Sequence, residues 1–348
     1  MKLTNEIEDC SHLRRSISRK VQKTGGVSLS VTLPKSWVQS EGIESGDDVF
    51  LSINEQGDLV IQSPQAKTIA SRSMKKEKII DITGISDEFL TRNIVAAYLL
   101  GHNAILLRSE DPLDPKKIRM IENIIQSFIG LELIDSNYRE ITIHDLSSPE
   151  SVDIIRFIKR MHKTVMHMLD DTIQGFAESS RERLQSVQLA EPNIDKLYYL
   201  LSRQLRSFLM DLNLESNFNF KLTTIIDYDR IVKRLEGLAD HCYKVSQIGI
   251  HLLETSDEKL TLENDMYEDA NYLTNMFRET MLAFFTKDIT QSNDLINQSH
   301  AFRDKIWSRI IEFNIENSSL TVFNFLRLLE RINNYIADIG EATINIFS

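Results

Sequence analysis

The clearest chemical signal in the sequence is a pair of carboxylates four residues apart, Glu236 and Asp240. On a helix, residues i and i+4 share one face, so the two carboxylates would stand side by side. They repel each other unless a cation or a base lies between them, and clustered oxygen ligands suit metal ions. The pair therefore predicts a site for a divalent or trivalent ion such as zinc, iron or magnesium. The alternative needs no metal, because Lys233 can pair with Glu236 on a solvated acidic face.

A second, weaker copy of this pair lies 94 residues later, at Glu330 and Asn334. The amide of Asn334 can coordinate an ion through its oxygen, but it adds no charge. Asp338 and Glu341, one turn further on, compensate in part. The metal prediction therefore covers both pairs and favours the first.

The two pairs belong to a longer internal repeat at the same offset. Apolar residues recur at steps of three and four, and Lys233 corresponds to Arg327 as Glu236 does to Glu330. Such a repeat favours two tandem three-helix bundles over one six-helix fold. The corresponding apolar positions are Tyr228, Ile231, Val232, Leu235, Leu238, Cys242 and Val245, matched by Val322, Phe325, Leu326, Leu329, Ile332, Ile336 and Ile339.

The elements that position these residues are long helices, since helical periodicity continues from Pro149 to the end of the chain. Short connections between long helices are typical of antiparallel bundles. The fold is therefore predicted to be mainly α in this region. The predicted helices span 150–187, 190–213, 221–255, 261–286, 290–315 and 319–347.

The repeated helix resembles that of the PhoU family of phosphate-uptake regulators. Residues 233–241 read Lys-Arg-Leu-Glu-Gly-Leu-Ala-Asp-His, and residues 327–335 read Arg-Leu-Leu-Glu-Arg-Ile-Asn-Asn-Tyr. Both look like the family's Arg-x-Leu-Glu-Arg-Ile-Ala-Asp-His helix. The resemblance implies two three-helix bundles, metal ions held by the Glu-x-x-x-Asp motifs, and negative regulation of phosphate uptake.

A short basic segment precedes the helical part. The whole chain carries a net charge of −11, yet the segment from Ser11 to Ser40 has no acidic residue and a charge of +6, which leaves −17 on the remainder. A basic module on an acidic body is typical of a protein with one element for a polyanion. The residues predicted to contact DNA phosphates are Arg14, Arg15, Arg19, Lys20, Lys23 and Lys35.

This basic segment opens a small β domain, predicted over residues 11–65. Apolar and polar residues alternate from Val27 to Leu33, Pro34 opens a short helix, and further strands follow near 49–53 and 59–61. The strings at 26–37 (Gly-Val-Ser-Leu-Ser-Val-Thr-Leu-Pro-Lys-Ser-Trp), 42–43, 46–49 and 57–61 resemble the AbrB/SpoVT swapped-hairpin family. The resemblance implies an intertwined homodimer whose basic strands contact double-stranded DNA.

Between the hairpin domain and the helical part lies a small α/β domain, predicted over residues 78–148 in the order β-α-β-α-β-β. Ser86 and Asp114 are expected to cap its two helices. It has no phosphate-cradling glycine loop, so a spacer or dimerisation role is the simplest interpretation. The predicted helical repeats occupy 149–256 and 261–348.

Composition limits the class of protein. The chain has 348 residues, 42% hydrophobic and 26% charged, with 12 glycines and 6 prolines, which suits a helix-rich globular protein of several domains. No apolar run approaches the roughly 18 residues of a membrane span. Cys10 and Cys242 lack the spacing of a zinc site or a disulfide scaffold. A cytoplasmic protein that is not membrane-inserted is predicted.

Two functions follow from this organisation. The first is a DNA-binding transcriptional regulator of phosphate uptake, with the helical part as sensor. The alternative is a signalling adaptor that binds a phosphate transporter or sensor kinase and uses the hairpin domain only to dimerise. An enzyme is not expected, because no nucleophile–base set accompanies the carboxylates.

Overall fold

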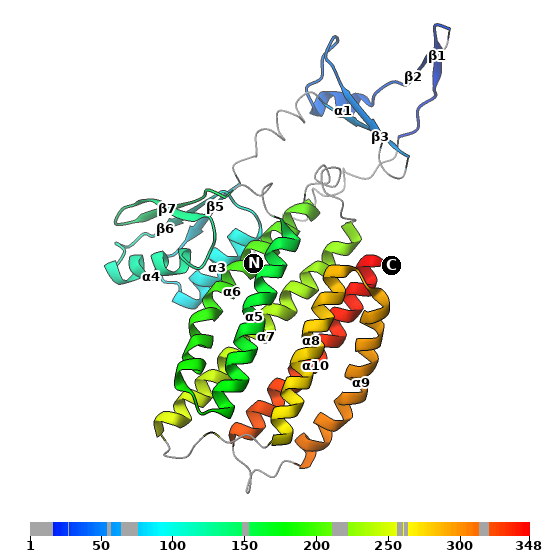
Figure 1. Cartoon of the computed structure of the whole chain (residues 1–348). Helices are drawn as coiled ribbons and strands as arrows, with labels where there is room; N and C mark the ends of the chain where they lie inside the picture. The colour runs from blue at the N-terminus through cyan, green and yellow to red at the C-terminus, as the bar shows by residue number, and fades with distance from the viewer. Residues whose placement is uncertain are drawn as a thin grey trace, which may run out of the picture. The chain divides into compact units, whose positions relative to one another are not determined.

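The computed structural model forms two compact units, Met1–Lys75 and Lys76–Ser348 (Figure 1). It describes residues 17–26, 28–53, 57–63, 76–147, 153–210, 222–255, 260, 264–312 and 320–348. Each unit has its own secondary structure, and the division falls close to the end of the predicted hairpin domain. The predicted four-domain division is a finer one, and it stays a prediction.

The N-terminal unit consists of two small hairpins and one short helix. Strand β1 (Gln22–Thr24) pairs antiparallel with β2 (Ser28–Ser30), and β3 (Phe50–Ile53) pairs antiparallel with β4 (Leu59–Gln62). Helix α1 (Lys35–Ser40) starts directly after Pro34, as expected from the fixed φ of proline. Gly25, with φ of 69°, allows the tight turn of the first hairpin. The small β domain with one helix is confirmed.

The strands of this unit expose their apolar side chains. Leu29 is 71% exposed, Leu51 60% and Ile53 75%. Two-stranded hairpins are marginally stable alone and need a covering element. Within its described residues, this unit therefore has an exposed apolar surface.

The α/β domain, residues 77–145, begins the second unit. Its sheet has the order β5-β6-β8-β7, with β5 and β6 parallel and the other neighbours antiparallel. Ser86 and Asp114 cap the helices as predicted: Ser86 Oγ accepts from Phe89 N at 3.3 Å, and Asp114 Oδ1 accepts from Lys116 N at 2.8 Å. The predicted element order is confirmed. The elements are β5 (Glu77–Asp81), α3 (Asp87–Leu99), β6 (Ala104–Arg108), α4 (Pro115–Ile125), β7 (Leu131–Ser136) and β8 (Glu140–Asp145).

The rest of the unit is a helical body of long, roughly aligned helices (Figure 1). Among the described residues, no helix is long and apolar enough to cross a membrane. A 3₁₀ turn, η3 (Leu222–Thr224), leads into the third helix. The helices are α5 (Ile154–Ala177), α6 (Arg181–Met210), α7 (Ile225–Thr255), α8 (Asn264–Thr286), α9 (Ile289–Glu312) and α10 (Leu320–Phe347).

The predicted boundary between the first two of these helices was wrong. Sequence analysis placed it at 187–190, whereas α5 ends at Ala177 and α6 begins at Arg181. Ser179 takes a positive φ of 54°, and Ser180 Oγ accepts from Arg183 N at 3.4 Å, so two serines make the turn. Helix α6 then passes through the predicted boundary without a break and contains Pro192.

The repeated apolar positions on α7 and α10 lie in one shared core. Thirteen of the fourteen predicted positions are buried and Val322 is half-buried. The buried residues of α5–α7 and of α8–α10 form a single hydrophobic cluster, in which the Phe176 and Phe325 rings meet at 5.7 Å. The corresponding charged positions also form the same ion pair in both repeats: Lys233 pairs with Glu236 at 2.9 Å, and Arg327 pairs with Glu330 at 2.5 Å. The repeat and the mainly helical fold class are confirmed.

The α/β domain is joined to the helical body through helix α6. Arg203 is only 6% exposed and forms an ion pair with the buried carboxylate of Asp145. Its guanidinium also lies 4.6 Å from the centre of the Tyr98 ring, and Tyr199 packs 5.0 Å from Phe128. A buried, hydrogen-bonded ion pair of this kind fixes the orientation of two elements.

Candidate functional site

Helix α6 carries a polar stripe that begins with two carboxylates. Glu191, Asp195, Tyr199 and Arg203 follow one another at steps of four residues, so neighbouring members share a face and the row winds gradually around the helix. The neighbouring positions Ile194, Leu197 and Leu201 are buried in the core and hold this side against α7. The stripe therefore has carboxylates at one end and, at the other, the Arg203–Asp145 ion pair that joins α6 to the α/β domain, which we call the joint.

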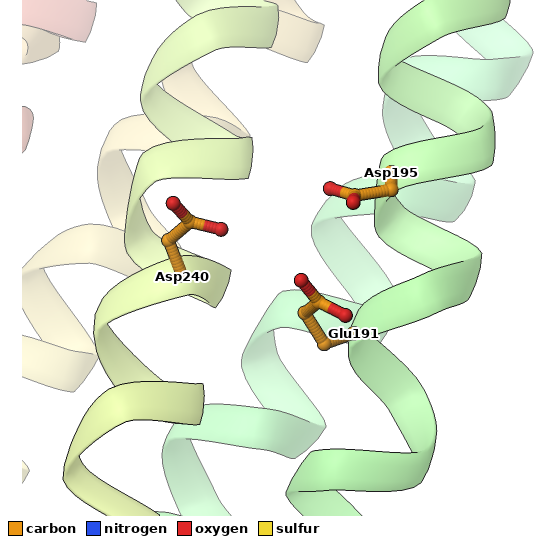
Figure 2. A group of neighbouring side chains, drawn as sticks. All are labelled: Glu191, Asp195 and Asp240. Carbon is orange, nitrogen blue, oxygen red and sulfur yellow. The ribbon is translucent and has the colours of Figure 1, made fainter. Parts of the chain in front are cut away.

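Helix α7 presents Asp240 to these two carboxylates. Its buried side chains Leu235, Leu238 and Cys242 fix the rotation of the helix, which leaves Glu236 and Asp240 half-buried at the boundary with α6. Carboxylate oxygens of Glu191, Asp195 and Asp240 all lie within 4.8 Å of one another. Figure 2 shows the three side chains pointing toward one another from the two helices. We call these three residues the carboxylate cluster.

The cluster is electrostatically strained. Burial, followed by the negative charges of Glu191, Asp240 and Glu236, raises the pKa of Asp195 to about 7. Burial and the charges of Asp240 and Glu236 also raise the pKa of Glu191. Carboxylates in this state favour either a shared proton or a bound cation.

Two lysines lie beside the cluster but do not neutralise it. Lys233 donates to Glu236 at 2.9 Å and lies 4.6 Å from the Tyr198 ring centre, while the exposed Lys244 is 3.5 Å from Asp240. Surface pairs of this type contribute about 1 kcal/mol or less. The donor set of three carboxylates therefore fits a hard divalent ion, which prefers oxygen ligands.

The structure brings together only part of the predicted first metal site. Asp240 belongs to the cluster, whereas Glu236 turns toward Lys233, as the metal-free alternative expected. Sequence analysis missed Glu191 and Asp195. Their signal was present, because they have the same four-residue spacing as the predicted pair.

The second predicted pair has different surroundings. Glu330 is held by Arg327 at 2.5 Å, and Asn334 is exposed at a cavity between α7, α9 and α10. Among the described residues, no group of three His, Cys, Asp or Glu side chains forms around it. Asp338, expected to compensate, instead pairs with Arg234 at 2.7 Å. The two predicted sites are therefore unlike in charge.

His241 follows Asp240 but does not serve it as an acid–base partner. Burial, and then the charges of Arg331 and Lys244, lowers the pKa of His241 to about 4, so its imidazole is neutral at pH 7. The charges of Arg331 and Arg327 act on it from α10, and its place in the helical period puts it about 100° around α7 from Asp240.

The predicted DNA contacts lie on the N-terminal unit. Arg19, Lys20, Lys23 and Lys35 are exposed, with Lys23 in β1 opposite Leu29 and Lys35 at the start of α1. Arg14 and Arg15 lie outside the described residues. The exposed cations are thus available to a polyanion.

Comparison with known proteins matches two segments of the chain. Residues 158–249 match the PhoU domain, and residues 22–69 match the family described as antidote-toxin recognition MazE, bacterial antitoxin. The first segment contains the whole carboxylate cluster, and the second covers most of the hairpin domain. The predicted combination of a PhoU-like helical part with an N-terminal hairpin domain is confirmed.

Solved structures give a more distant likeness. The phosphate transport system regulatory protein PhoU from Streptococcus pneumoniae is 14% identical, with a TM-score of 0.46, over 56% of this chain and 92% of that one. PhoU from Pseudomonas aeruginosa is 16% identical, with a TM-score of 0.38, over 56% of this chain and 95% of that one. The chain matches none of the curated proteins.

Proposed function

We propose that this chain is a cytoplasmic, DNA-binding transcriptional regulator of phosphate uptake, in which the helical body acts as the sensor. The observation that carries the proposal is the pairing, in one chain, of a PhoU domain with a basic hairpin domain. A PhoU domain suggests a role in regulating phosphate homeostasis, and a basic hairpin domain is compatible with DNA binding. No catalytic role is assigned to either part.

The hairpin domain supplies the DNA-binding end of this proposal. Its exposed lysines and arginines would contact backbone phosphates, which fix affinity and position but not sequence. The exposed Leu29, Leu51 and Ile53 would be covered by a second copy, so the domain would bind as a homodimer. Binding should therefore require the dimer and weaken with salt.

The carboxylate cluster supplies the sensing end. We propose that Glu191, Asp195 and Asp240 hold a divalent cation, which would relieve the repulsion between α6 and α7. Because Arg203 lies on the same helix, a change in the position of α6 would reach the α/β domain. The cluster and the contact with the α/β domain are thus two parts of one helix.

Charge reversal on the hairpin tests the DNA-binding half. We expect Arg19→Glu with Lys23→Glu to abolish duplex binding in a fluorescence-anisotropy titration, while the matched variant Arg160→Glu on α5 binds normally. Size-exclusion chromatography must show both variants as dimers. Duplex binding that survives the hairpin reversal would overturn the assignment of these residues.

The alternative is a signalling adaptor, which the PhoU domain match alone would also support. In that case the helical body binds a phosphate transporter or a sensor kinase, and the hairpin domain only dimerises. Co-purification of wild type and the hairpin-reversed variant from cells separates the two. The adaptor predicts the same captured partner from both and no change in gene expression.

A further inference from the structure

The second repeat contains a polar cavity whose chemistry is opposite to that of the carboxylate cluster. It lies between α7, α9 and α10 and has a volume of about 390 Å³. A single water needs only about 10–15 Å³ of such space, so the cavity has room for a small ion and its hydration. Its basic and amide side chains are Arg234, His300, Arg303, Arg331, Asn333 and Asn334. We call it the arginine cavity.

Two of its three arginines are not neutralised by a close carboxylate of the cavity. Arg234 is matched by Asp338 at 2.7 Å, and the second acidic residue of the lining, Glu341, lies 3.6 Å from Arg230. Arg303 meets only the exposed carboxylate of its neighbour Asp304, at 3.9 Å. Arg331 makes no ion pair with any residue in the described part of the chain. The cavity therefore attracts anions.

Asn333, one of the lining residues, has a buried acceptor that lacks a donor. Asn333 is 2% exposed, its Nδ2 donates to Ser299 O at 3.1 Å, and its Oδ1 has no hydrogen-bond partner among the described residues. A buried amide oxygen without a donor is energetically unfavourable. If the Asn333 side chain turns toward the cavity, an anion that carries a proton supplies that donor while its other oxygens accept from guanidinium groups.

The internal repeat explains how the two sites diverged. Asn334 stands where the first repeat has Asp240, and the facing helix α9 offers Ser299 and Arg303 rather than two carboxylates. An amide in place of a carboxylate removes repulsion toward an anion, and guanidinium groups bind tetrahedral oxyanions through paired N–H donors.

We propose that the arginine cavity binds a protonated tetrahedral oxyanion, inorganic phosphate, through Arg303 and Arg331, with Asn333 accepting the proton of the anion. This assignment rests on the proposed function, since it would supply the regulator with its effector. Arg234 is held by Asp338 and shapes the wall of the site.

Isothermal titration of inorganic phosphate into the full-length dimer, in a phosphate-free buffer, tests this inference. Hydrogen bonds to charged groups are strong, so Arg303→Gln and Arg331→Gln should each weaken phosphate binding at least about tenfold. Asn334→Asp, on an exposed residue, should weaken it as well by returning a negative charge to the cavity. The matched control Arg160→Gln, an exposed arginine on α5, should leave the affinity unchanged.

Sulfate serves as the second probe, because it lacks the proton that Asn333 would accept. We expect sulfate to bind at least about tenfold more weakly than phosphate. Equal binding of the two anions, no binding of phosphate to the folded dimer, or an affinity unaffected by all three cavity variants would each overturn the inference. A protein that binds duplex DNA but not phosphate contradicts only this site, whereas phosphate binding without DNA binding contradicts only the proposed function.

Discussion

The two repeats of the helical body share a core and a charge register but differ in what they offer a ligand. In the first, Glu191, Asp195 and Asp240 gather negative charge between α6 and α7. In the second, the corresponding region holds arginines and amides between α7, α9 and α10. Duplicated helices thus preserve their packing positions, which burial constrains, while half-buried polar positions are free to change sign.

The repeats differ also in their connections. Helix α6, in the first repeat, is fixed to the α/β domain through the ion pair of Arg203 with Asp145. The carboxylate cluster therefore lies on a helix that also contacts the α/β domain, whereas the arginine cavity lies between α7, α9 and α10.

The largest effect is expected from breaking that joint. Arg203→Ala would leave the buried carboxylate of Asp145 without its partner, which should lower the free energy of unfolding by about 3–5 kcal/mol. Urea unfolding followed by circular dichroism measures the change. The exposed Arg206, one turn along α6, supplies the control, and Arg206→Ala should change stability little. Equal stability of both variants would show that the joint does not fix the domain.

Removing the cluster should abolish the first site and spare the second. Glu191→Gln with Asp195→Asn leaves one carboxylate, so we expect Mn²⁺ affinity to fall by about a hundredfold or more, because hard cations depend on charged oxygen ligands. Calorimetry with Mn²⁺ checks this against Asp304→Asn, an exposed residue of α9. Unchanged Mn²⁺ binding in the double variant would place the ion elsewhere.

The pH dependence of stability should separate the repeats. Because the pKa of Asp195 is about 7 in the folded protein and near 3.8 when unfolded, the folded state binds the proton more tightly. The contribution of Asp195 to the stability of the metal-free protein should therefore fall as pH rises from about 4 to about 7, by about 1–2 kcal/mol after screening, whereas the lowered pKa of His241 contributes in the opposite direction. In urea titrations at each pH, wild type should therefore lose stability relative to Asp195→Asn over this range, but not relative to Asn334→Asp. A difference between wild type and Asp195→Asn that does not change with pH would contradict the assignment.

The smallest effect concerns the feature that the repeats share. Lys233→Gln and Arg327→Gln each remove an i, i+3 ion pair, and we expect similar losses of about 0.5–1 kcal/mol in the free energy of unfolding. Thermal unfolding at low and high salt measures both. A loss several times larger in one repeat would show that the two pairs are not equivalent.

The sequence predicted most of the fold because its signals are local. Helical periodicity on α7 and α10, the caps Ser86 and Asp114, and the alternation near Val31 each depend on a few neighbouring residues. The predicted α5–α6 boundary was wrong because the true turn depends on the positive φ of Ser179, which the hydrophobic periodicity of the helices does not show.

The candidate sites were harder to predict, since they depend on which helices face each other. Asp240 was found from its spacing to Glu236, but its actual neighbours come from α6, 45 and 49 residues earlier. Glu236 forms an ion pair with Lys233 instead, because this lysine lies one turn away on the same helix. The arginine cavity joins three helices, and no local pattern shows such an arrangement.

The most direct test of the account is a titration of the full-length dimer against its own promoter region and random duplex DNA, at two salt concentrations, with and without Mn²⁺ and phosphate. We predict binding that weakens steeply with salt, is tighter for the promoter, and changes when either ligand is added. A folded dimer that binds neither duplex at low salt would contradict the account and favour the adaptor.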